Sequence, residues 1–363
     1  MTNILIVGYK HIATFDMTTI AFERYSKYLP IVVHSKFSKD VSSYDLKWCD
    51  IFMCIRGDDP LSAYLCRIAK KHAKRVILLI DDDLLEYELY KQPLYDRMRK
   101  IALKSVLTHA DILLTPSEYL GNKLCKQFNI PYVVTNTVVD SEDIKTRRDS
   151  SDNIRIVYAC SHNAHFNKLV KPMLHKLSAR YGEFISFTII GPSVDLSDTG
   201  LSVTHVDSMP LQKYREYMNT HTFDIGLAPL EDTEMTRSKY FNKYIEYTNN
   251  QIVGIYSNNL PYTLVVKDGF NGLLADNTPE AWYLKTCEII DNKELRAVCL
   301  DNASKHIKET LSLSQILSEL VRDMPDIISY RAAETHIPVL FSSLIFHLIE
   351  FISKVDYRIA RMF

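Results

Sequence analysis

The feature that most constrains the fold of this chain is a repeated alternation of short, fully apolar runs with longer amphipathic stretches. In the first half, the apolar runs that we interpret as strands are Ile4–Gly8, Ile31–His34, Ile51–Ile55, Val76–Ile80, Ile112–Thr115 and Tyr132–Val134. Between them, apolar residues recur at helical spacing, as in Leu61–His72 and Leu94–Thr108. Continuous apolar strands that alternate with helices predict a parallel β-sheet covered by helices on both faces.

The same rhythm starts again after a polar, charge-rich stretch, 141–152, which we interpret as a linker. The strands predicted after it are Arg155–Ala159, Phe184–Ile190, Phe223–Ala228, Ile252–Tyr256 and Gly272–Ala275. We therefore predict an α/β protein of two Rossmann-like parallel-sheet domains that face each other across a cleft. The first domain would span 1–150, the second 151–312, and C-terminal helices 313–363. Ligands of such sheets bind at the carboxyl ends of the strands, so the predicted site is the cleft.

Composition and missing motifs exclude several functional classes. The net charge is −1 over 363 residues, which disfavours a generally basic nucleic-acid-binding protein. The chain has neither a G-x-G-x-x-G motif nor a P-loop, which weighs against a dehydrogenase or a P-loop enzyme. Its seven cysteines include no C-x-x-C pair, which predicts reduced thiols in a cytoplasmic protein and no zinc site. We expect neither a signal peptide nor a membrane-spanning helix.

The most informative segment is 223–247, where a buried strand leads through a polar loop into a predicted helix. Lys239, Lys243 and Glu246 stand at i, i+4 and i+7, so on one helix all three would share a face. A helix N-terminus already favours an anion, and lysines there suit a diphosphate, while a carboxylate can accept hydrogen bonds from ribose hydroxyls. The alternative is a solvated face that carries only a Lys243–Glu246 ion pair.

This segment resembles the C-terminal signature of group-1 glycosyltransferases, family-four-like enzymes of the GT-B fold. In that family a helix with the pattern E-x7-E, or a variant with Lys three residues before the second Glu, holds the nucleotide-sugar donor. Glu246 matches the second Glu, and Lys239 and Lys243 match the lysine-bearing variant. Ser238 stands where the first Glu would be, so that contact with the donor sugar is missing.

Other segments resemble the same family in the same order along about 300 residues. Asp268–Ala275 resembles its D-G-x-N-G-L-L segment, and 158–165 resembles its first strand and loop of the donor domain. The latter resemblance implies that Ser161 and His165 line the donor pocket. In the first domain, 80–84, 110–120 and 136–140 resemble further family segments, and the turn at Gly8 and Tyr9 is expected to border the acceptor.

Three adjacent carboxylates, Asp81, Asp82 and Asp83, follow the predicted strand 76–80. Carboxylate pairs can hold a divalent cation, but we expect Asp81 to shape the cleft or the acceptor pocket instead. Arg56 follows the strand 51–55 and would point into the cleft. It could meet a phosphate or the acceptor, or it could form an ion pair with Asp58 or Asp59.

Two basic clusters and the C-terminal tail suggest proximity to a membrane. The clusters are Lys70, Lys71, Lys74 and Arg75, and Arg97, Lys100 and Lys104. They could be solvated faces, or they could be attracted to an anionic leaflet. The tail, 337–352, is strongly apolar but too short and interrupted to span a bilayer. It could form an interfacial helix, or it could pack back on the first domain.

These observations predict a glycosyltransferase that moves a sugar from a nucleotide-sugar donor to a glycan or lipid-linked saccharide in cell-surface polysaccharide synthesis. The resemblance implies retention of anomeric configuration, no obligatory metal or other cofactor, and catalysis by electrostatic stabilisation of the departing diphosphate. The expected location is cytoplasmic, with an anionic membrane surface as a candidate partner. The alternatives are a nucleotide-sugar epimerase and a non-catalytic partner protein that kept the fold.

Overall fold

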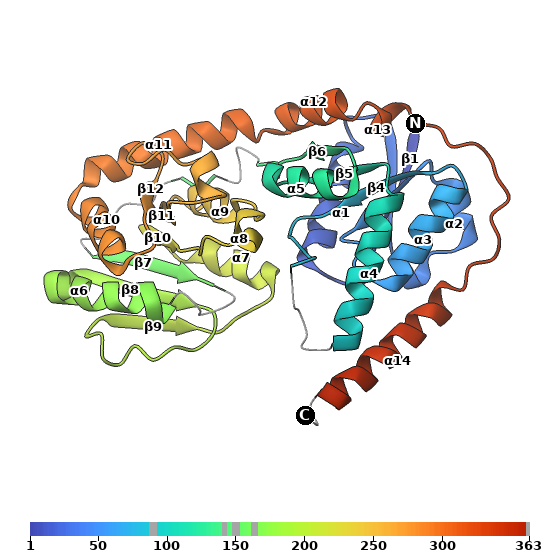
Figure 1. Cartoon of the computed structure of the whole chain (residues 1–363). Helices are drawn as coiled ribbons and strands as arrows, with labels where there is room; N and C mark the ends of the chain where they lie inside the picture. Colours follow the sequence, from blue (N-terminus) through green and yellow to red (C-terminus); the bar gives the residue numbers. More distant parts are fainter. Residues whose placement is uncertain (87–92, 140–143, 147–152, 161–165, 361–363) are drawn as a thin grey trace. The chain divides into compact units, whose positions relative to one another are not determined.

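The computed structural model describes residues 1–86, 93–139, 144–146, 153–160 and 166–360 (Figure 1). The chain divides into two compact units. The first consists of Met1–Thr137 and Ser314–Phe363, and the second of Val138–Leu313. The division therefore falls at Thr137 and not at the expected residue 150, and the chain returns to the first unit at Ser314. Of the predicted linker, 141–152, only residues 144–146 are among the described residues.

The first unit is built on a parallel six-stranded sheet in the order β2-β1-β3-β4-β5-β6. Its strands are β1 (Thr2–Gly8), β2 (Ile31–Phe37), β3 (Ile51–Ile55), β4 (Arg75–Leu79), β5 (Ile112–Thr115) and β6 (Tyr132–Val134). Its helices are α1 (Ala13–Tyr25), η1 (Ser38–Asp40), α2 (Ser43–Trp48), α3 (Pro60–Lys71), α4 (Pro93–His109) and α5 (Glu118–Phe128). The central strands are wholly buried, as their unbroken apolar runs predict.

The C-terminal segment adds three helices to this unit, namely α12 (Leu313–Asp323), α13 (Asp326–Ser329) and α14 (Ser342–Ala360). It is tied to the first unit along its length. The guanidinium of Arg331 donates to Thr2 Oγ1, and the Ser342 hydroxyl donates to the Val41 carbonyl. Ile337 and Ile349 belong to the first unit's hydrophobic core. One face of the tail therefore packs on the first unit, which was one of the two alternatives open from the sequence.

The second unit repeats the architecture with a parallel six-stranded sheet in the order β12-β11-β10-β7-β8-β9. Its strands are β7 (Ile154–Ala159), β8 (Ile185–Ile190), β9 (Ser202–Val206), β10 (Ile225–Ala228), β11 (Val253–Ser257) and β12 (Leu273–Ala275). Its helical segments are η3 (Phe166–Val170), α6 (Lys171–Tyr181), η4 (Gly182–Phe184), α7 (Leu211–Thr220), α8 (Glu234–Arg237), α9 (Asn242–Asn249), η5 (Tyr262–Leu264), α10 (Pro279–Asp291) and α11 (Lys293–Thr310). The α/β prediction with two parallel sheets is confirmed.

Two local features differ from the sequence prediction. The strand β9 was missed because it is an exposed edge strand, whose mixed sequence Ser-Val-Thr-His-Val lacks a continuous apolar run. The helix expected to carry Lys239 is also broken. Phe241 has a non-helical ψ of 42°, and α9 starts only after it, at Asn242. Tyr240 and Phe241 are both buried, with their rings 4.1 Å apart.

The turn after β8 brings two strand ends into close contact at the carboxyl edge of the second sheet. Gly191 has φ +149°, and a Cβ atom there would lie 2.2 Å from the Cys160 carbonyl oxygen. Gly269 also has a positive φ, +71°, but nothing lies within 4 Å of a Cβ at that position. The two glycines therefore separate the effect of backbone conformation from that of backbone contact.

We expect Gly191→Ala to lower the free energy of unfolding by about 2–4 kcal/mol, because β7 and β8 must move apart. Gly269→Ala, the matched control, should lower it by about 1 kcal/mol through backbone conformation alone. Urea unfolding followed by circular dichroism measures both values. Equal losses in the two variants would contradict the close approach of the Cys160 carbonyl.

Candidate functional site

The candidate site lies at the carboxyl edge of the second sheet, by the ends of β7, β10 and β11. The loop after β10 is held by polar side chains from neighbouring strand ends. The backbone N–H of Leu230 donates to Ser257 Oγ at 2.7 Å. The side-chain amides of Asn259 and Asn277 both donate to the Leu230 carbonyl, at 3.0 and 2.8 Å. This loop is fixed before it reaches the helices that follow it.

Helix α9 is docked on the sheet by an aromatic residue that packs against a glycine. A Cβ at Gly226, in the middle of β10, would lie 2.5 Å from the ring of Tyr247. The Tyr247 hydroxyl donates to the Leu227 carbonyl at 2.8 Å, and the residue is completely buried. This contact lets α9 approach the sheet closely and fixes the direction of its other side chains.

Lys243 and Glu246 are the two predicted site residues that the structure brings together. Lys243 Nζ donates to Glu246 Oε1 at 2.8 Å, and the two side chains are only 25% and 24% exposed. Burial raises the pKa of the Cys160 thiol, and the charge on Lys243 partly opposes that rise. The ammonium group therefore lies near Cys160, at the carboxyl end of β7. The Lys243–Glu246 ion pair considered from the sequence therefore exists, but it is half-buried and does not lie on a fully solvated face.

Tyr214 on α7 completes this group and was missed from the sequence. Its hydroxyl donates to Glu246 Oε1 and accepts from Lys243 Nζ at 2.8 Å. The Lys243 ammonium also lies 4.8 Å from the centre of the Tyr214 ring, a cation–π distance. Burial and the adjacent Glu246 carboxylate raise the pKa of Tyr214 far above its usual value, so the hydroxyl stays protonated and donates. A tyrosine on a short helix gives no sequence signal for this role.

The other predicted donor-side residues have different positions. Lys239 lies in the turn between α8 and α9, where its backbone N–H donates to the Thr236 carbonyl, so it does not share a helical face with Lys243. Ser161 and His165 lie outside the described residues. Asn271, in the family-like segment 268–275, was expected to be structural, and its buried amide donates to Val265 O and Tyr244 Oη.

At the carboxyl edge of the first sheet, Arg56 is bound to two of the three adjacent carboxylates. Its guanidinium donates to Asp81 Oδ1 at 2.9 Å and to Asp82 Oδ2 at 3.3 Å. Asp58, one of the two partners considered for Arg56 from the sequence, pairs with Arg99. Asp83 is buried and pairs with Lys123 at 2.8 Å. Within the described ranges, no group of three or more His, Cys, Asp or Glu residues is arranged to hold a metal ion.

The two residues of the first turn are both enclosed by neighbouring side chains. A Cβ at Gly8 would lie 2.5 Å from the ring of Phe15. Tyr9 is buried, its ring 5.3 Å from that of Phe346, and its hydroxyl donates to Glu350 of α14 at 2.9 Å. Tyr9 therefore anchors the C-terminal helix, a contact that the first turn alone did not predict.

A buried carboxylate also occupies this edge, at the start of α3. Asp59 caps that helix by accepting the Ser62 N–H at 2.8 Å through Oδ1, while its buried Oδ2 has no hydrogen-bond partner among the described residues. Burial raises the pKa of Asp59 from 3.8 to about 6. The folded protein therefore binds this proton more tightly than the unfolded chain does.

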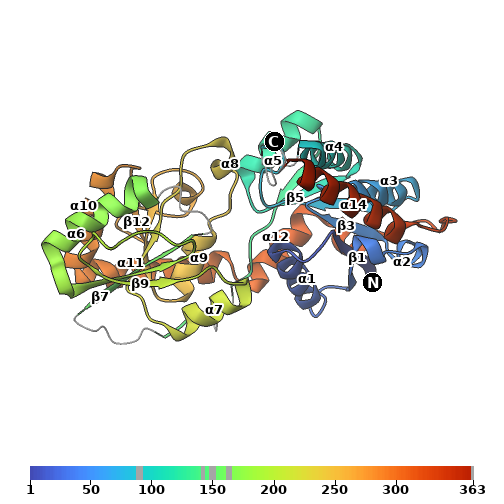
Figure 2. The same ribbon diagram turned by 90° about the horizontal axis from the view of Figure 1, so that it is seen from below.

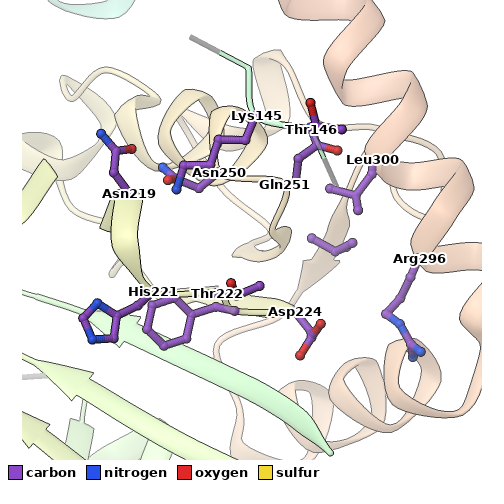
Figure 3. A pocket seen from close by; sticks show the side chains of 12 residues that line it. Lys145, Thr146, Asn219, His221, Thr222, Asp224, Asn250, Gln251, Arg296 and Leu300 are labelled. Atoms are coloured by element: carbon purple, nitrogen blue, oxygen red, sulfur yellow. The ribbon is translucent and has the colours of Figure 1, made fainter. Parts of the chain in front are cut away.

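A hollow in the second unit lies at the opposite edge of the sheet (Figure 3). Its lining includes Phe223, Asp224 and Gln251, which directly precede β10 and β11, together with Lys145 and Arg296. The cavity volume of about 30 Å³ has room for one or two water molecules. It is too small for a nucleotide, and neither Lys243 nor Glu246 lines it.

No protein-family model matches the sequence, and no curated protein matches it significantly. Solved structures do match. Sucrose-phosphate synthase from Thermosynechococcus elongatus has a TM-score of 0.64 at 10% identity, covering 89% of this chain and 98% of that protein. HepE of Anabaena, solved with UDP-glucose, has a TM-score of 0.64 at 12% identity, covering 90% and 100%.

A third match is WaaG, a glycosyltransferase involved in lipopolysaccharide biosynthesis. Its TM-score is 0.58 at 12% identity, with 91% of this chain and all of that protein covered. Each of the three alignments covers nearly the whole length of both proteins. The chain has the GT-B fold. The expected fold is thereby confirmed, and the carboxyl edge of the second GT-B sheet is the edge that carries Lys243, Glu246 and Tyr214.

The raised pKa of Asp59 predicts a pH dependence of stability in this GT-B protein. The folded-state pKa of about 6 exceeds the ordinary 3.8. The contribution of the protonated Asp59 carboxyl to the free energy of unfolding is therefore complete below about pH 4 and is lost as pH rises through 6. Asp59→Asn keeps a capping oxygen but cannot ionise, so it should be more stable than the parent by about 2 kcal/mol at pH 7.5 and nearly equal to it near pH 4.

Urea unfolding of both proteins at the two pH values measures this difference. Asp207→Asn, at a side chain that is 95% exposed, is the control and should leave the pH dependence of the parent unchanged. If Asp59→Asn destabilises the protein equally at both pH values, the carboxylate is not the source of the effect.

Proposed function

We propose that this protein is a glycosyltransferase that moves a sugar from a nucleotide-sugar donor to a glycan or lipid-linked saccharide, in the synthesis of a cell-surface polysaccharide. The observation that carries the proposal is the half-buried Lys243–Glu246–Tyr214 group at the carboxyl edge of the second sheet. HepE, which has the same fold, was solved with UDP-glucose and with UDP, and this supports a nucleotide-sugar as the donor.

Within this proposal, Lys243 binds the donor diphosphate. It is the second residue of α9, and among the described residues no side chain caps that helix. The first backbone N–H groups of α9 and the Lys243 ammonium can therefore bind an anion together. The low exposure of the ammonium strengthens this attraction relative to bulk water. As the glycosidic bond breaks, the same positive charge stabilises the diphosphate leaving group.

Glu246 accepts hydrogen bonds from the donor ribose in this account. In the free protein its Oε1 accepts from Tyr214 and Lys243, so a ribose hydroxyl would bind the other carboxylate oxygen or replace one of these donors. We propose that Lys239, Ser161 and His165 line the same donor site. We place four residues on the acceptor side, namely Arg56, Gly8, Tyr9 and Asp81. Tyr9 acts there by positioning α14, since its hydroxyl donates to Glu350.

We further propose that transfer proceeds with retention and without an obligatory metal or other cofactor. The acidic residues that follow β4 already bind cations of the protein, since Asp81 pairs with Arg56 and Asp83 with Lys123. The protein would work in the cytoplasm and peripherally at a membrane surface, where a lipid-linked acceptor is presented.

One observation favours a second candidate, a non-catalytic GT-B partner protein that still binds a nucleotide. Ser238 stands where the resembling family carries its first Glu. It is completely buried, and its hydroxyl donates to the Glu234 carbonyl at 3.0 Å. It cannot make a carboxylate's contact with a donor sugar. Release of nucleoside diphosphate that depends on an acceptor distinguishes the transferase from this partner, and free sugar epimers formed without any acceptor would indicate an epimerase.

A thermal-shift panel of UDP-, GDP-, ADP-, CMP- and dTDP-sugars tests donor binding. We expect one nucleotide class to raise the melting temperature, and Lys243→Ala and Glu246→Ala each to abolish that rise. Lys285→Ala is the matched control, because Lys285 also forms an i,i+3 pair, with Glu288, and is 24% exposed. It should retain the full shift. Retention of the shift by Lys243→Ala would refute the site assignment.

Two substitutions at Tyr214 separate its hydroxyl from its ring. Tyr214→Phe keeps the cation–π contact with Lys243 but removes the hydroxyl from Glu246, so donor affinity should stay the same or rise. Tyr214→Ala removes both, leaves Lys243 more mobile, and should weaken donor binding about tenfold. Calorimetric titration with the nucleotide from the panel measures both. Equal weakening by the two variants would show that the hydroxyl, and not the ring, supports the site.

A further inference from the structure

The C-terminal helix α14 exposes a continuous apolar stripe on the face turned away from the first unit. Four residues at i, i+4, i+7 and i+11 form this stripe: Leu344, Leu348, Phe351 and Val355. They are 69%, 59%, 64% and 40% exposed. Their spacing places them on one side of the helix, opposite the buried Ile349. A run of large apolar side chains with this exposure on one helix face marks an interaction surface.

The position of the stripe is fixed, because the inward face of α14 is held by specific contacts. Glu350 accepts the Tyr9 hydroxyl at 2.9 Å. Asp356 is buried and accepts the Tyr95 N–H, at the start of α4, at 2.9 Å. The two acidic residues of α14 are thus both bound to the first unit. The outward face carries the apolar stripe and, beside it, the exposed Lys354 and Arg358.

Helix α4 packs beside α14 and extends the same kind of surface (Figure 2). On α4, Leu94 and Ile101 are 51% and 59% exposed, and Arg97 and Lys104 are also exposed. The core-facing side of this helix is Tyr95, Ala102, Leu103, Val106 and Leu107. Both helices thus combine exposed apolar side chains with exposed cations.

The other predicted basic cluster has a structural role. Lys74 is buried and donates to the Lys47 carbonyl. Lys70 and Arg75 both pair with Asp111, and Arg75 also pairs with Asp326 of α13. Two of the four charges are thus paired with carboxylates of the first unit and a third is buried, so the surface formed by α14 and α4 is the better candidate for an anionic partner.

We propose that the outward face of α14, together with α4, docks the protein on an anionic lipid bilayer, with the stripe inserted at the boundary between headgroups and acyl chains. Apolar side chains beside cations match the two layers that such a surface presents. A second copy of this chain is the poorer partner, because pairing through this face offers no carboxylates to Lys354 and Arg358: the acidic residues of α14 are already bound on its inward face. No helix in the described part of the chain is long and apolar enough to cross a membrane.

This inference deepens the proposed peripheral location and is independent of the transferase activity. It is tested by sedimentation of full-length protein with sucrose-loaded vesicles, without donor or acceptor. One set of vesicles contains phosphatidylcholine and phosphatidylglycerol, and the other only phosphatidylcholine. We expect binding to the anionic set, weakened by salt. Leu348→Ser with Phe351→Ser, and separately Lys354→Gln with Arg358→Gln, should each lower the partition coefficient about tenfold or more.

Matched controls lie in the second unit. Leu284→Ser with Val298→Ser removes two apolar side chains of similar exposure, and Lys305→Gln with Lys308→Gln removes two exposed cations. Neither pair should change vesicle binding, and thermal unfolding checks that every variant folds. Absence of binding to anionic vesicles, or full binding by the stripe variant, overturns the proposal. So does self-association of the parent that is lost in the stripe variant without any vesicle binding, which would identify a second copy as the partner.

Discussion

The packing of Tyr247 against Gly226 is the contact on which the candidate site depends. With no side chain at Gly226, the ring lies directly on β10 and the hydroxyl reaches the Leu227 carbonyl at 2.8 Å. Helix α9 is therefore held against the carboxyl half of the sheet. On that helix, Lys243 and Glu246 bond to each other and to the Tyr214 hydroxyl of α7. A larger residue at Gly226 would displace the helix and both charged groups with it.

The two units use the carboxyl edges of their sheets in different ways. In the first unit, most charged groups at that edge have a partner of opposite charge within the unit: Asp81 has Arg56, Asp58 has Arg99, and Asp83 has Lys123. These pairs fix the loops and leave the Asp59 carboxylate buried. In the second unit, Lys243 and Glu246 also pair with each other, but both bond the neutral Tyr214 hydroxyl as well, and α9 begins without a side-chain cap among the described residues. That arrangement is suited to exchanging its contacts for those of an anionic ligand.

The amino-acid sequence predicted the sheets well because a parallel sheet buries each central strand on both faces. The runs at β3, β5 and β6 match to the residue, while β9, an exposed edge strand, had no such pattern. Local spacing also placed Lys243 and Glu246 on one helix face. It failed for Lys239, because the break at Phe241 comes from burial of two adjacent rings. Long-range partners had no local signal: Tyr214 lies 32 residues from Glu246, and Tyr9 lies 341 residues from Glu350.

A crystal structure of the protein with the nucleoside diphosphate that stabilises it would test the central claim most directly. The account predicts phosphate oxygens within hydrogen-bond distance of Lys243 Nζ and of the first N–H groups of α9, and a ribose hydroxyl at the Glu246 carboxylate. A nucleotide bound elsewhere would contradict it. In that case the Lys243–Glu246–Tyr214 contacts would be left unchanged.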